Sequence, residues 1–512
     1  MNPTHCGVNF SWPDFLKGIV QKFFILAAIA LCGCPAVGPD YVKPEVEQPK
    51  AWHSKLDNGL SATAMSTEAL ARWWTTLNDP VLSELMTRAM SGNLDLQGAQ
   101  ARVREARARR GISQAGYYPA VDASGNYATN RSSESTVPTA QGKEYQMYNV
   151  GVDAAWEIDL FGGVRRSVEA ADADLAATQE DLNNVLVSLL AEAALTYVDV
   201  RTLQKRVEVA EANVKAQQET YLLTQSRFKA GLTDELAVQG ASYALAGTRA
   251  QIPALQARLV ASMNSLDVLL GLTPGTVHAQ LSAKAPIPVP PASVAVGVPA
   301  ETLRNRPDVR RAERQLAAQT ALIGVAKADL YPKLSLVGTI GYEAQNLQNI
   351  GNASNNLLDS GNLTYRYGPS VSWAIFRGGA VFQNIEVQNA RQEQALKFYK
   401  STVLSALGEA ESALAAYARE QERRDQLVTA TQAASMAFKL ARNQYQAGLV
   451  DFSVVLIAQQ SMLNYEDQLA LSEGAVTTNL VKLYKSLGGG WTAQTNLSQG
   501  GPQHGNNPKQ KK

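Results

Sequence analysis

Cysteine is almost absent from this chain. Only Cys6, Cys32 and Cys34 occur among its 512 residues, so nothing after residue 34 can form a disulfide or a thiolate metal site. The histidines are just as sparse and are scattered singly, as His5, His53, His278 and His504. We therefore expect no metal site built from histidine and cysteine.

A surplus of either charge is also missing. The chain has 47 Lys and Arg against 46 Asp and Glu, a net charge of +1. A nucleic-acid-binding protein should show a basic surplus or a basic stripe, so this balance gives no support to that class. The sequence also suggests no phosphate-binding loop and no Ser-His-Asp set. We expect no enzyme, no cofactor and no nucleic-acid partner.

Long apolar runs are missing past residue 34. No later stretch approaches the roughly 20 apolar residues that a membrane-spanning helix needs. If the mature chain crosses a membrane, it must do so with β-strands, because backbone polar groups in lipid have to be paired.

The first 34 residues read as an export signal. Lys17 and Lys22 precede a short apolar run, residues 23–31, as in a secretory signal peptide. The run ends in the segment Leu-Cys-Gly-Cys34, which looks like a bacterial lipobox with Cys34 as the residue lipidated after cleavage. Acyl chains there would add about 0.8 kcal/mol of anchoring per buried methylene. The alternative is an ordinary signal peptide with incidental cysteines.

The chain is a tandem repeat. The segment Arg-Phe-Lys-Ala-Gly-Leu-Thr-Asp at residues 227–234 reappears as Gln-Tyr-Gln-Ala-Gly-Leu-Val-Asp at residues 444–451. Trp156 and Trp373 are separated by the same 217 positions. Repetition on this scale implies that each half is one structural unit that packs beside its copy.

We divide the chain accordingly into five parts. These are a lipoprotein signal peptide at 1–33, an N-terminal equatorial or linker segment at 34–90, a first repeat at 91–299, a second repeat at 300–490 and a tail at 491–512 that reads as disordered. Each repeat has a helical segment, two strands, a very long helix, a glycine turn and a returning helix. The expected strands are 118–129, 148–159, 332–343 and 364–375. The expected hairpin helices are 164–229, 233–270, 380–446 and 450–487.

Helix length is a strong signal in this sequence. Between Gly163 and Gly231 lie 67 residues without Gly or Pro, and a continuous helix of that length would be about 100 Å long. Apolar residues recur there every seven positions, at Val200, Val207, Val214, Tyr221 and Phe228. Such length and spacing are typical of a coiled coil or of a tube of helices. A filamentous coiled-coil scaffold is the alternative, but the strands argue against it.

Four segments alternate between apolar and polar residues as outer-membrane strands do. The side chains expected to face lipid are Val150, Val152, Trp156 and Ile158 in the first repeat, and Val371, Trp373 and Ile375 in the second. A half-buried sheet in a soluble domain would alternate in the same way, but it would not need such long flanking helices. Four strands cannot close a barrel, so the chain must oligomerise. The number of copies does not follow from the strands themselves.

Several motifs resemble those of the outer membrane efflux protein family, the TolC-like channels. They are Gly-Pro-Asp-Tyr-Val-Lys-Pro at residues 38–44, Trp73-Trp74, Trp-Glu-Ile-Asp-Leu-Phe-Gly at 156–162, Gln-Ile-Pro-Ala-Leu at 251–255 and Arg-Asn-Arg-Pro-Asp-Val at 304–309. Together with the lipobox they are most similar to the lipoprotein branch, the NodT/OprM-like channels of RND-type tripartite efflux systems. The resemblance extends over roughly residues 31–491.

This resemblance implies a mixed, mainly α-helical fold that assembles as a homotrimer. Three chains would form a twelve-stranded outer-membrane β-barrel and a long periplasmic α-helical barrel, belted by an equatorial region that includes the linker 286–298. The implied partners are a periplasmic membrane-fusion adaptor and an inner-membrane RND-type transporter. The implied function is a passive exit duct for small molecules such as drugs, lipid-anchored in the outer membrane of a Gram-negative bacterium.

Two other functions remain open on the sequence. The same duct would serve a protein-secretion system if its cargo were a polypeptide. A structural lipoprotein with a coiled coil and no pore would share the long helices. A conductance measurement separates the last of these from a duct.

If the long helices form a tube, the two glycine turns are its periplasmic tips. By resemblance, the adaptor-docking residues are Ala230, Gly231 and Leu232 at one turn, and Ala447, Gly448 and Leu449 at the other. Asp234, Glu235 and Asp451 then lie at or just inside the mouth, where symmetry copies would form a negative ring. The alternative is that these acids only cap or solvate the helix start.

The gate is where the chain departs from the family. Relatives often place an aspartate just before an Ala-Gln pair in the last helix, and this chain has Ile457 there. Ser453 stands one turn nearer the tip, where a bulky apolar residue is frequent. Tyr445 matches a tyrosine that helps to hold the tips shut in some relatives. An arginine partner for this tyrosine is expected just after the tip, but this chain has Val450 at that position. We therefore expect the closed state to depend on Ile457 and Tyr445 rather than on an acid ring.

Overall fold

The computed structural model describes residues 36–46, 49–133, 144–347 and 357–492. The expected signal peptide, Cys34 and almost all of the expected tail lie outside the described residues. The chain divides into two compact units. The first comprises the residues up to Lys43, Glu105–Ala176 and Arg314–Lys397, and the second comprises Pro44–Arg104, Ala177–Glu313 and the residues from Phe398 onward. Each unit draws on both repeats, so the compact units are not the two halves of the sequence.

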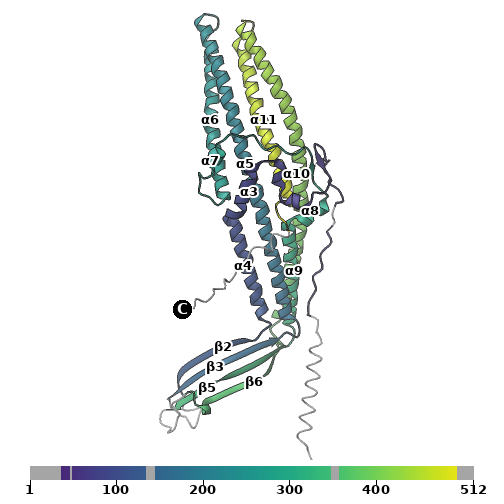
Figure 1. Ribbon diagram of the computed structural model, residues 1–512. Helices are drawn as coiled ribbons and strands as arrows, with labels where there is room; N and C mark the ends of the chain where they lie inside the picture. Colours follow the sequence, from purple (N-terminus) through teal and green to yellow (C-terminus); the bar gives the residue numbers. More distant parts are fainter. Residues whose placement is uncertain (1–35, 47–48, 134–143, 348–356, 493–512) are drawn as a thin grey trace, which may run out of the picture. The chain divides into compact units, whose positions relative to one another are not determined.

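The first unit contains a four-stranded antiparallel sheet (Figure 1). Its strands are β2 (Ala120–Arg131), β3 (Glu144–Ile158), β5 (Lys333–Leu347) and β6 (Leu363–Ser372). They are hydrogen-bonded in the order β2-β3-β5-β6, so the two repeats meet between β3 and β5. The expected end of the last strand is wrong, because β6 stops at Ser372 and both Trp373 and Ile375 lie beyond it.

The pairing register gathers apolar side chains on one face of the sheet. Val152 lies opposite Ile340, while Ile158 lies opposite Leu334, which in turn lies opposite Val371. Paired residues on adjacent strands point to the same face. That face therefore carries the predicted residues Val150, Val152, Trp156, Ile158 and Val371. The opposite face carries the polar row Asp122, Asp153, Thr339 and Arg366.

Three long helices come from each repeat (Figure 1). They are α4 (Leu94–Ala115), α5 (Gly163–Lys229) and α6 (Glu235–Leu269) in the first, and α9 (Pro307–Ala328), α10 (Ala380–Gln446) and α11 (Phe452–Ser486) in the second. Both α5 and α10 run for 67 residues, and Gly408 does not interrupt α10. The mixed, mainly helical fold with a tandem repeat is confirmed.

Short elements that the sequence did not predict surround the hairpins of the second unit. They are β1 (Leu60–Ser61), α2 (Thr67–Ala71), η1 (Trp73–Leu77), α3 (Pro80–Gly92), α7 (His278–Leu281), β4 (Val294–Ala295) and α8 (Pro299–Asn305). A further turn, η2 (Ser360–Asn362), precedes β6 in the first unit. The strands β1 and β4 pair in parallel, with Val294 N donating to the carbonyl of Gly59 at 2.8 Å.

A dense apolar core joins these short elements to the long helices, and we call it the belt core. It is built around four fully buried aromatic side chains, Trp73, Tyr197, Tyr417 and Tyr484. The rings of Trp73 and Tyr484 stack with their centroids 5.4 Å apart. Aromatic side chains of this size bury the largest apolar areas, so this core contributes much of the stability of the second unit.

Polar groups inside the belt core are paired with one another. The hydroxyl of Tyr197 donates to Asp79 Oδ2 at 2.7 Å, and Asp79 Oδ1 caps α3 by accepting from Leu82 N at 3.0 Å. Arg201 Nε donates to the Tyr197 hydroxyl at 3.0 Å, and its Nη1 donates to the carbonyl of Ala283 at 2.9 Å. Burial raises the pKa of Tyr197, so its phenol stays neutral and can keep donating.

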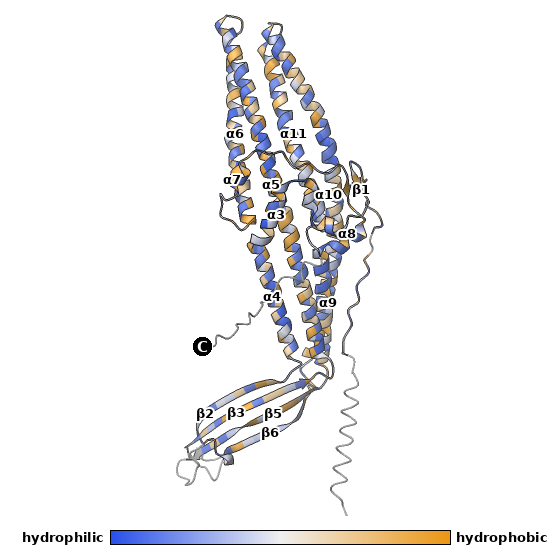
Figure 2. Cartoon of the chain, viewed as in Figure 1, coloured by the Kyte–Doolittle hydropathy of each residue, from blue (hydrophilic) through white to orange (hydrophobic). Residues whose placement is uncertain are grey.

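Hydropathy is mixed along every long helix (Figure 2). Among the residues that the structure describes, no helix combines the length and the apolar composition that crossing a membrane requires.

Candidate functional site

The two hairpins of the second unit end in turns of the same backbone geometry. Gly231 follows α5 with φ 72°, and Gly448 follows α10 with φ 75°. The next residue bonds back in each case, Leu232 N to the Arg227 carbonyl and Leu449 N to the Gln444 carbonyl, both at 2.9 Å. This is the helix-ending motif that requires a left-handed residue, which explains the Ala-Gly-Leu repeat.

The residues predicted for adaptor docking all lie in these turns. They are Ala230, Gly231, Leu232, Ala447, Gly448 and Leu449. Leu232 and Leu449 are 64% and 75% exposed, and an added Cβ on Gly231 would meet no atom within 4 Å. The turns therefore present small, accessible surfaces with an apolar side chain on each.

Asp234 and Asp451, the aspartates that follow the two turns, occupy equivalent positions but differ in their hydrogen bonds. Asp234 is the N-cap of α6, and its carboxylate accepts from Ala237 N at 2.9 Å. Asp451 is the N-cap of α11 but makes no side-chain capping bond. Glu235 is exposed in the first turn of α6. The capping alternative therefore describes Asp234, while the carboxylate of Asp451 remains available for another role.

The predicted gate residues of the second hairpin are split between two environments. Ser453 and Ile457 are exposed and lie one helical turn apart on α11, with Ile457 at 64% exposure. Tyr445 is instead 2% exposed, and its ring meets Phe452 edge-on at 5.7 Å. The structure thus places Ser453 and Ile457 together and puts Tyr445 inside the packing between helices.

Tyr445 belongs to a small apolar core, which we call the tip core. Its buried members are Ala237, Ala241, Ala434, Phe438, Ala441, Tyr445, Phe452, Val455 and Met462. The Tyr445 hydroxyl is buried, and it has no hydrogen-bond partner among the described residues. Tyr445 therefore packs in this core through its ring rather than through a hydrogen bond.

Arg227 at the end of α5 is a tip residue that the sequence did not point to. Its guanidinium lies 4.7 Å from the centre of the Tyr445 ring, and its Nη1 donates to the Gln446 carbonyl at 3.1 Å. The family resemblance led us to expect an arginine in the same hairpin as Tyr445, at the position where this chain has Val450. In the structure, the arginine beside the Tyr445 ring comes from the other hairpin. A local motif cannot show this, because Arg227 and Gln446 are 219 positions apart.

The apolar face of the sheet ends in two equivalent tryptophans. Trp156 Nε1 donates to the Tyr117 carbonyl, and Trp373 Nε1 donates to the Leu330 carbonyl, both at 3.0 Å. Trp373 thus repeats the contact of Trp156 although it stands outside β6. Ile375 also lies outside the strand and is 81% exposed. Indole rings with one bonded N–H suit a boundary between an apolar and a wet surface.

The first described residues form a strap against the end of β3 and the start of α5. Val37 N donates to the Phe161 carbonyl at 3.0 Å, and Ala36 lies against Gly162, where an added Cβ would collide with it. Arg166 donates to the carbonyls of Ala36, Val37 and Gly38 and to Asp40. Burial alone would lower the pKa of Arg166, but its hydrogen bonds to Asp40 and Glu169 outweigh that effect and raise it. The strap is therefore held by a buried cation.

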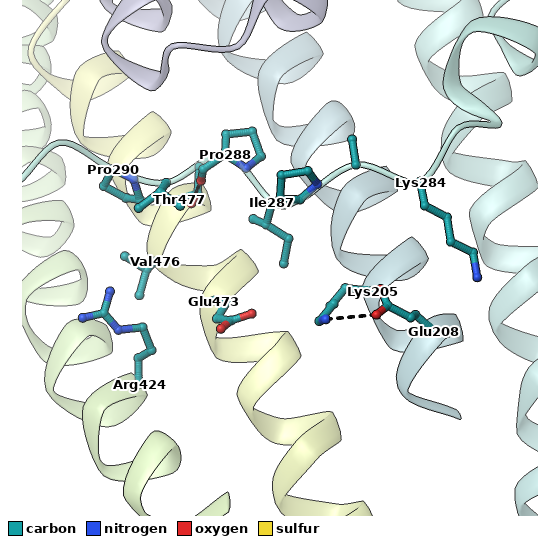
Figure 3. Close-up of a pocket in the computed structure, with 13 residues that line it drawn as sticks. Lys205, Glu208, Lys284, Ile287, Pro288, Pro290, Arg424, Glu473, Val476 and Thr477 are labelled. Carbon is teal, nitrogen blue, oxygen red and sulfur yellow. Dashed lines mark hydrogen bonds and ion pairs between the residues drawn. The ribbon is translucent and has the colours of Figure 1, made fainter. Parts of the chain in front are cut away.

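A cleft of about 500 Å³ lies along residues 284–290, and Figure 3 draws the side chains that line it. Lys205 and Glu208 on α5 form an ion pair at 3.4 Å on one side, and Glu473 and Arg424 lie on the other. None of the predicted gate residues lines this cleft. No group of three metal-binding side chains occurs among the described residues.

Comparisons with known proteins agree with this architecture. A model of the family described as outer membrane efflux protein matches residues 85–272 and 298–489, one match in each repeat. Nodulation protein T of Rhizobium leguminosarum bv. trifolii is 32% identical over 450 residues, covering 86% of this chain and 91% of that protein. The solvent efflux pump outer membrane protein SrpC of Pseudomonas putida is 29% identical over 477 residues, covering 92% of this chain and 98% of that protein.

A solved structure extends the likeness to three dimensions. The outer-membrane channel OprN matches with a TM-score of 0.81 at 36% identity, covering 89% of this chain and 99% of that one. The family match spans more than half of the sequence, and the relatives are covered almost from end to end. The chain belongs to the outer membrane efflux protein family.

Proposed function

We propose that this chain is the exit duct of a tripartite efflux pump, and that it is not an enzyme. It would conduct small molecules passively from an inner-membrane transporter and a periplasmic adaptor to the outside. Family membership and the likeness to the outer-membrane channel OprN support this function. The hairpins built on the 67-residue helices supply a structure long enough to extend into the periplasm.

The observation that carries this proposal is the open sheet with one apolar face. β2 and β6 stand at its edges, and each has a hydrogen-bonded neighbour on one side only among the described strands. Backbone groups of an edge cannot be left unpaired in lipid. Copies of the chain would pair these edges, and three copies would close a ring of twelve strands with the face of Val150, Val152 and Trp156 toward lipid.

The gate in this proposal is formed by the hairpin tips. Ser453 and Ile457 lie exposed on one side of α11, just after Asp451, the N-cap residue whose carboxylate makes no capping hydrogen bond. In a ring of copies, this side of α11 would supply the constriction, with Ile457 as its apolar part. Leu232 and Leu449 would meet the tips of the adaptor, since they project from the turns.

The lipid anchor on Cys34 is part of the same proposal. Pro35 alone separates Cys34 from Ala36, and Ala36 lies against Gly162, four residues after β3 ends. The described part of the chain thus begins against the segment that follows β3, and the proposed anchor is attached two positions before it in the sequence. Metabolic labelling with palmitate tests it: the wild type should be labelled and Cys34→Ser should not.

Planar-bilayer recording of the purified full chain tests the duct. Discrete conductance steps are expected, whereas a scaffold without a pore would give none. Ile457→Ala should raise the conductance or the antibiotic leakage of the assembled protein, because it widens the proposed constriction. Ile457→Ala channels whose conductance and antibiotic leakage equal those of the wild type would refute the assignment of Ile457.

The adaptor and the pump are tested by capture from the native envelope. Cross-linking through Leu232→Cys or Leu449→Cys should trap an adaptor, and an RND-type transporter should be recovered with it. Recovery of an ATP-driven exporter together with a secreted polypeptide would instead favour a protein-secretion duct.

A further inference from the structure

The cleft along residues 284–290, which we call the linker cleft, has the size and composition of a ligand site. Its volume of about 500 Å³ falls within the range of pockets that hold small molecules, roughly 300–1,000 Å³. The linker, α5, α10 and α11 enclose it (Figure 3). Its charged residues are Lys205, Glu208, Lys284, Arg424 and Glu473. A site with both signs of charge suits a ligand that also carries both.

Glu473 is the charged group of this cleft that lacks a partner. The other charged side chains form ion pairs within the described part of the chain: Lys205 with Glu208, Lys284 with Glu211, and Arg424 with Asp425. Glu473 has neither a hydrogen bond nor an ion pair with any residue that the structure describes, and Figure 3 shows its side chain in the space between Lys205 and Arg424. An unpaired carboxylate in a partly enclosed site attracts a cationic group, such as the ammonium of a ligand.

Lys205 supplies the opposite charge in a form that a ligand can use. Its ammonium approaches Glu208 only to 3.4 Å, and the two side chains are 42% and 54% exposed. Water screens so exposed an ion pair, which therefore contributes little. Arg424 is held more firmly, because it donates to Asp425 Oδ1 from two nitrogens, at 3.0 and 2.6 Å. A carboxylate bound in the cleft would thus replace Glu208 at Lys205 more readily than Asp425 at Arg424.

The backbone of the linker leaves two hydrogen-bond donors unused. Proline occupies positions 286, 288 and 290, which therefore have no N–H. Ile287 and Val289 between them keep their N–H groups, and neither donates to any residue in the described ranges. The Pro288 carbonyl accepts from Thr477 Oγ1 at 2.7 Å, which fixes the linker on α11. An extended peptide beside a fixed strand-like segment binds through such free backbone groups, two residues apart.

We propose that the linker cleft binds a short peptide with free ends. The ammonium of the peptide would bind Glu473, its carboxylate would bind Lys205, and its backbone carbonyls would accept from Ile287 and Val289. Small or aliphatic side chains of the peptide would lie against Ile287 and Val476, which are 8% and 1% exposed and line the cleft. The inference goes beyond the proposed duct and does not depend on it, because binding in this cleft requires no conduction.

Calorimetric titration of the full chain, assembled in detergent, with three matched peptides tests the site. Trialanine has both free ends, trialanine amide lacks the carboxylate, and N-acetyl-trialanine lacks the ammonium. Trialanine should bind, and each of the other two should bind at least about tenfold more weakly, the factor lost with one charge-assisted hydrogen bond. Absence of trialanine binding, or equal affinities for the three peptides, would overturn the proposal.

Two variants assign the ends of the peptide. Glu473→Gln should weaken binding of trialanine and trialanine amide about tenfold and leave N-acetyl-trialanine unchanged, because only the first two carry the ammonium. Lys205→Met should weaken trialanine and N-acetyl-trialanine by a similar factor and leave the amide unchanged. Glu192→Gln and Lys215→Met are the matched controls, since both residues are exposed on α5 and neither lines the cleft. Affinities equal to those of the controls would refute the assignment.

Val289 tests whether the ligand is read through its backbone. Val289→Pro removes the N–H and should weaken all three peptides roughly threefold or more, the factor for one neutral hydrogen bond. Val289→Ala keeps the donor and should bind like the wild type, since Val289 is 71% exposed. Equal affinities of these two variants would overturn the peptide as the ligand, because any molecule with both charges would then serve. If Lys205→Met does not assemble, Lys205→Gln removes the same charge.

Discussion

The tip and the belt core stabilise the same two hairpins in different ways. The belt core buries Trp73, Tyr197, Tyr417 and Tyr484 completely and pairs its polar groups, as Arg201 does. The tip core is smaller, and its Tyr445 hydroxyl finds no hydrogen-bond partner in the part of the chain that the structure describes. Local stability follows buried apolar contact and satisfied hydrogen bonds, so the belt core should hold while the tip opens.

The glycines that end the helices should show the largest difference between the two regions. Gly271 at the belt core and Gly231 at the tip both have positive φ, 70° and 72°. An added Cβ on Gly271 would collide with the Gly92 carbonyl, whereas one on Gly231 meets nothing within 4 Å. Gly271→Ala should lower the free energy of unfolding by about 3 kcal/mol or more, and Gly231→Ala should lower it by about 1–2 kcal/mol. Equal losses of unfolding free energy in denaturant titrations would break the comparison.

Two arginines provide the next test. Arg201 is 2% exposed and donates to the Tyr197 hydroxyl, Gln204 and the Ala283 carbonyl, so Arg201→Met leaves buried acceptors unpaired. The expected loss is about 2–3 kcal/mol of unfolding free energy. Arg227→Met at the tip should cost about 1 kcal/mol or less. Thermal unfolding of the two assembled variants against the wild type measures both, and a larger loss at Arg227 would contradict the contrast.

Alkali should act on the belt core. Burial, with a smaller effect from Tyr484, raises the pKa of Tyr417 from 10.0 to about 12. A raised folded-state pKa means that this contribution to stability is complete below pH 10 and is lost as the pH rises from 10 to 12. Tyr417 by itself should lower the free energy of unfolding by about 1.4 kcal/mol per pH unit in that window, in addition to the fall caused by Tyr197 and Tyr484, whose pKa values burial also raises. Tyr417→Phe, measured by denaturant titration over the same range, should make the slope shallower by that amount; an unchanged slope would exclude a contribution from Tyr417.

The helix caps after the two turns should show the smallest difference. Asp234 accepts from Ala237 N at 2.9 Å, but Asp451 makes no side-chain capping bond. Asp234→Ala should lower the free energy of unfolding by about 1 kcal/mol, and Asp451→Ala should lower it by only a few tenths of that amount. The comparison is sharpened by conductance: Asp451→Ala should change ion selectivity more than Asp234→Ala if its free carboxylate faces the pore.

The sequence predicts those features whose cause is local. Gly163, Gly231 and Gly448 mark the ends of the long helices, so the helix bounds agree with the structure to within a residue or two. Alternation predicts the shared face of Val150 and Val371, because strand side chains have a period of two.

The remaining features depend on contacts between distant segments. Alternation continues through Trp373, yet β6 ends at Ser372, where the chain leaves the sheet and the indole bonds to the Leu330 carbonyl. The belt core was missed because its short elements have no clear period, and its bonds join Asp79 and Tyr197 across 118 positions. The cover of Tyr445 by Arg227 was missed for the same reason.

The strap held by Arg166 has a consequence for assembly. If Cys34 carries the proposed acyl chains, the lipid is attached two positions before Ala36, which lies against Gly162. Each newly folded copy would then be confined to the membrane surface. Encounters between copies become a search in two dimensions rather than three, which raises their effective concentration without any new contact between them.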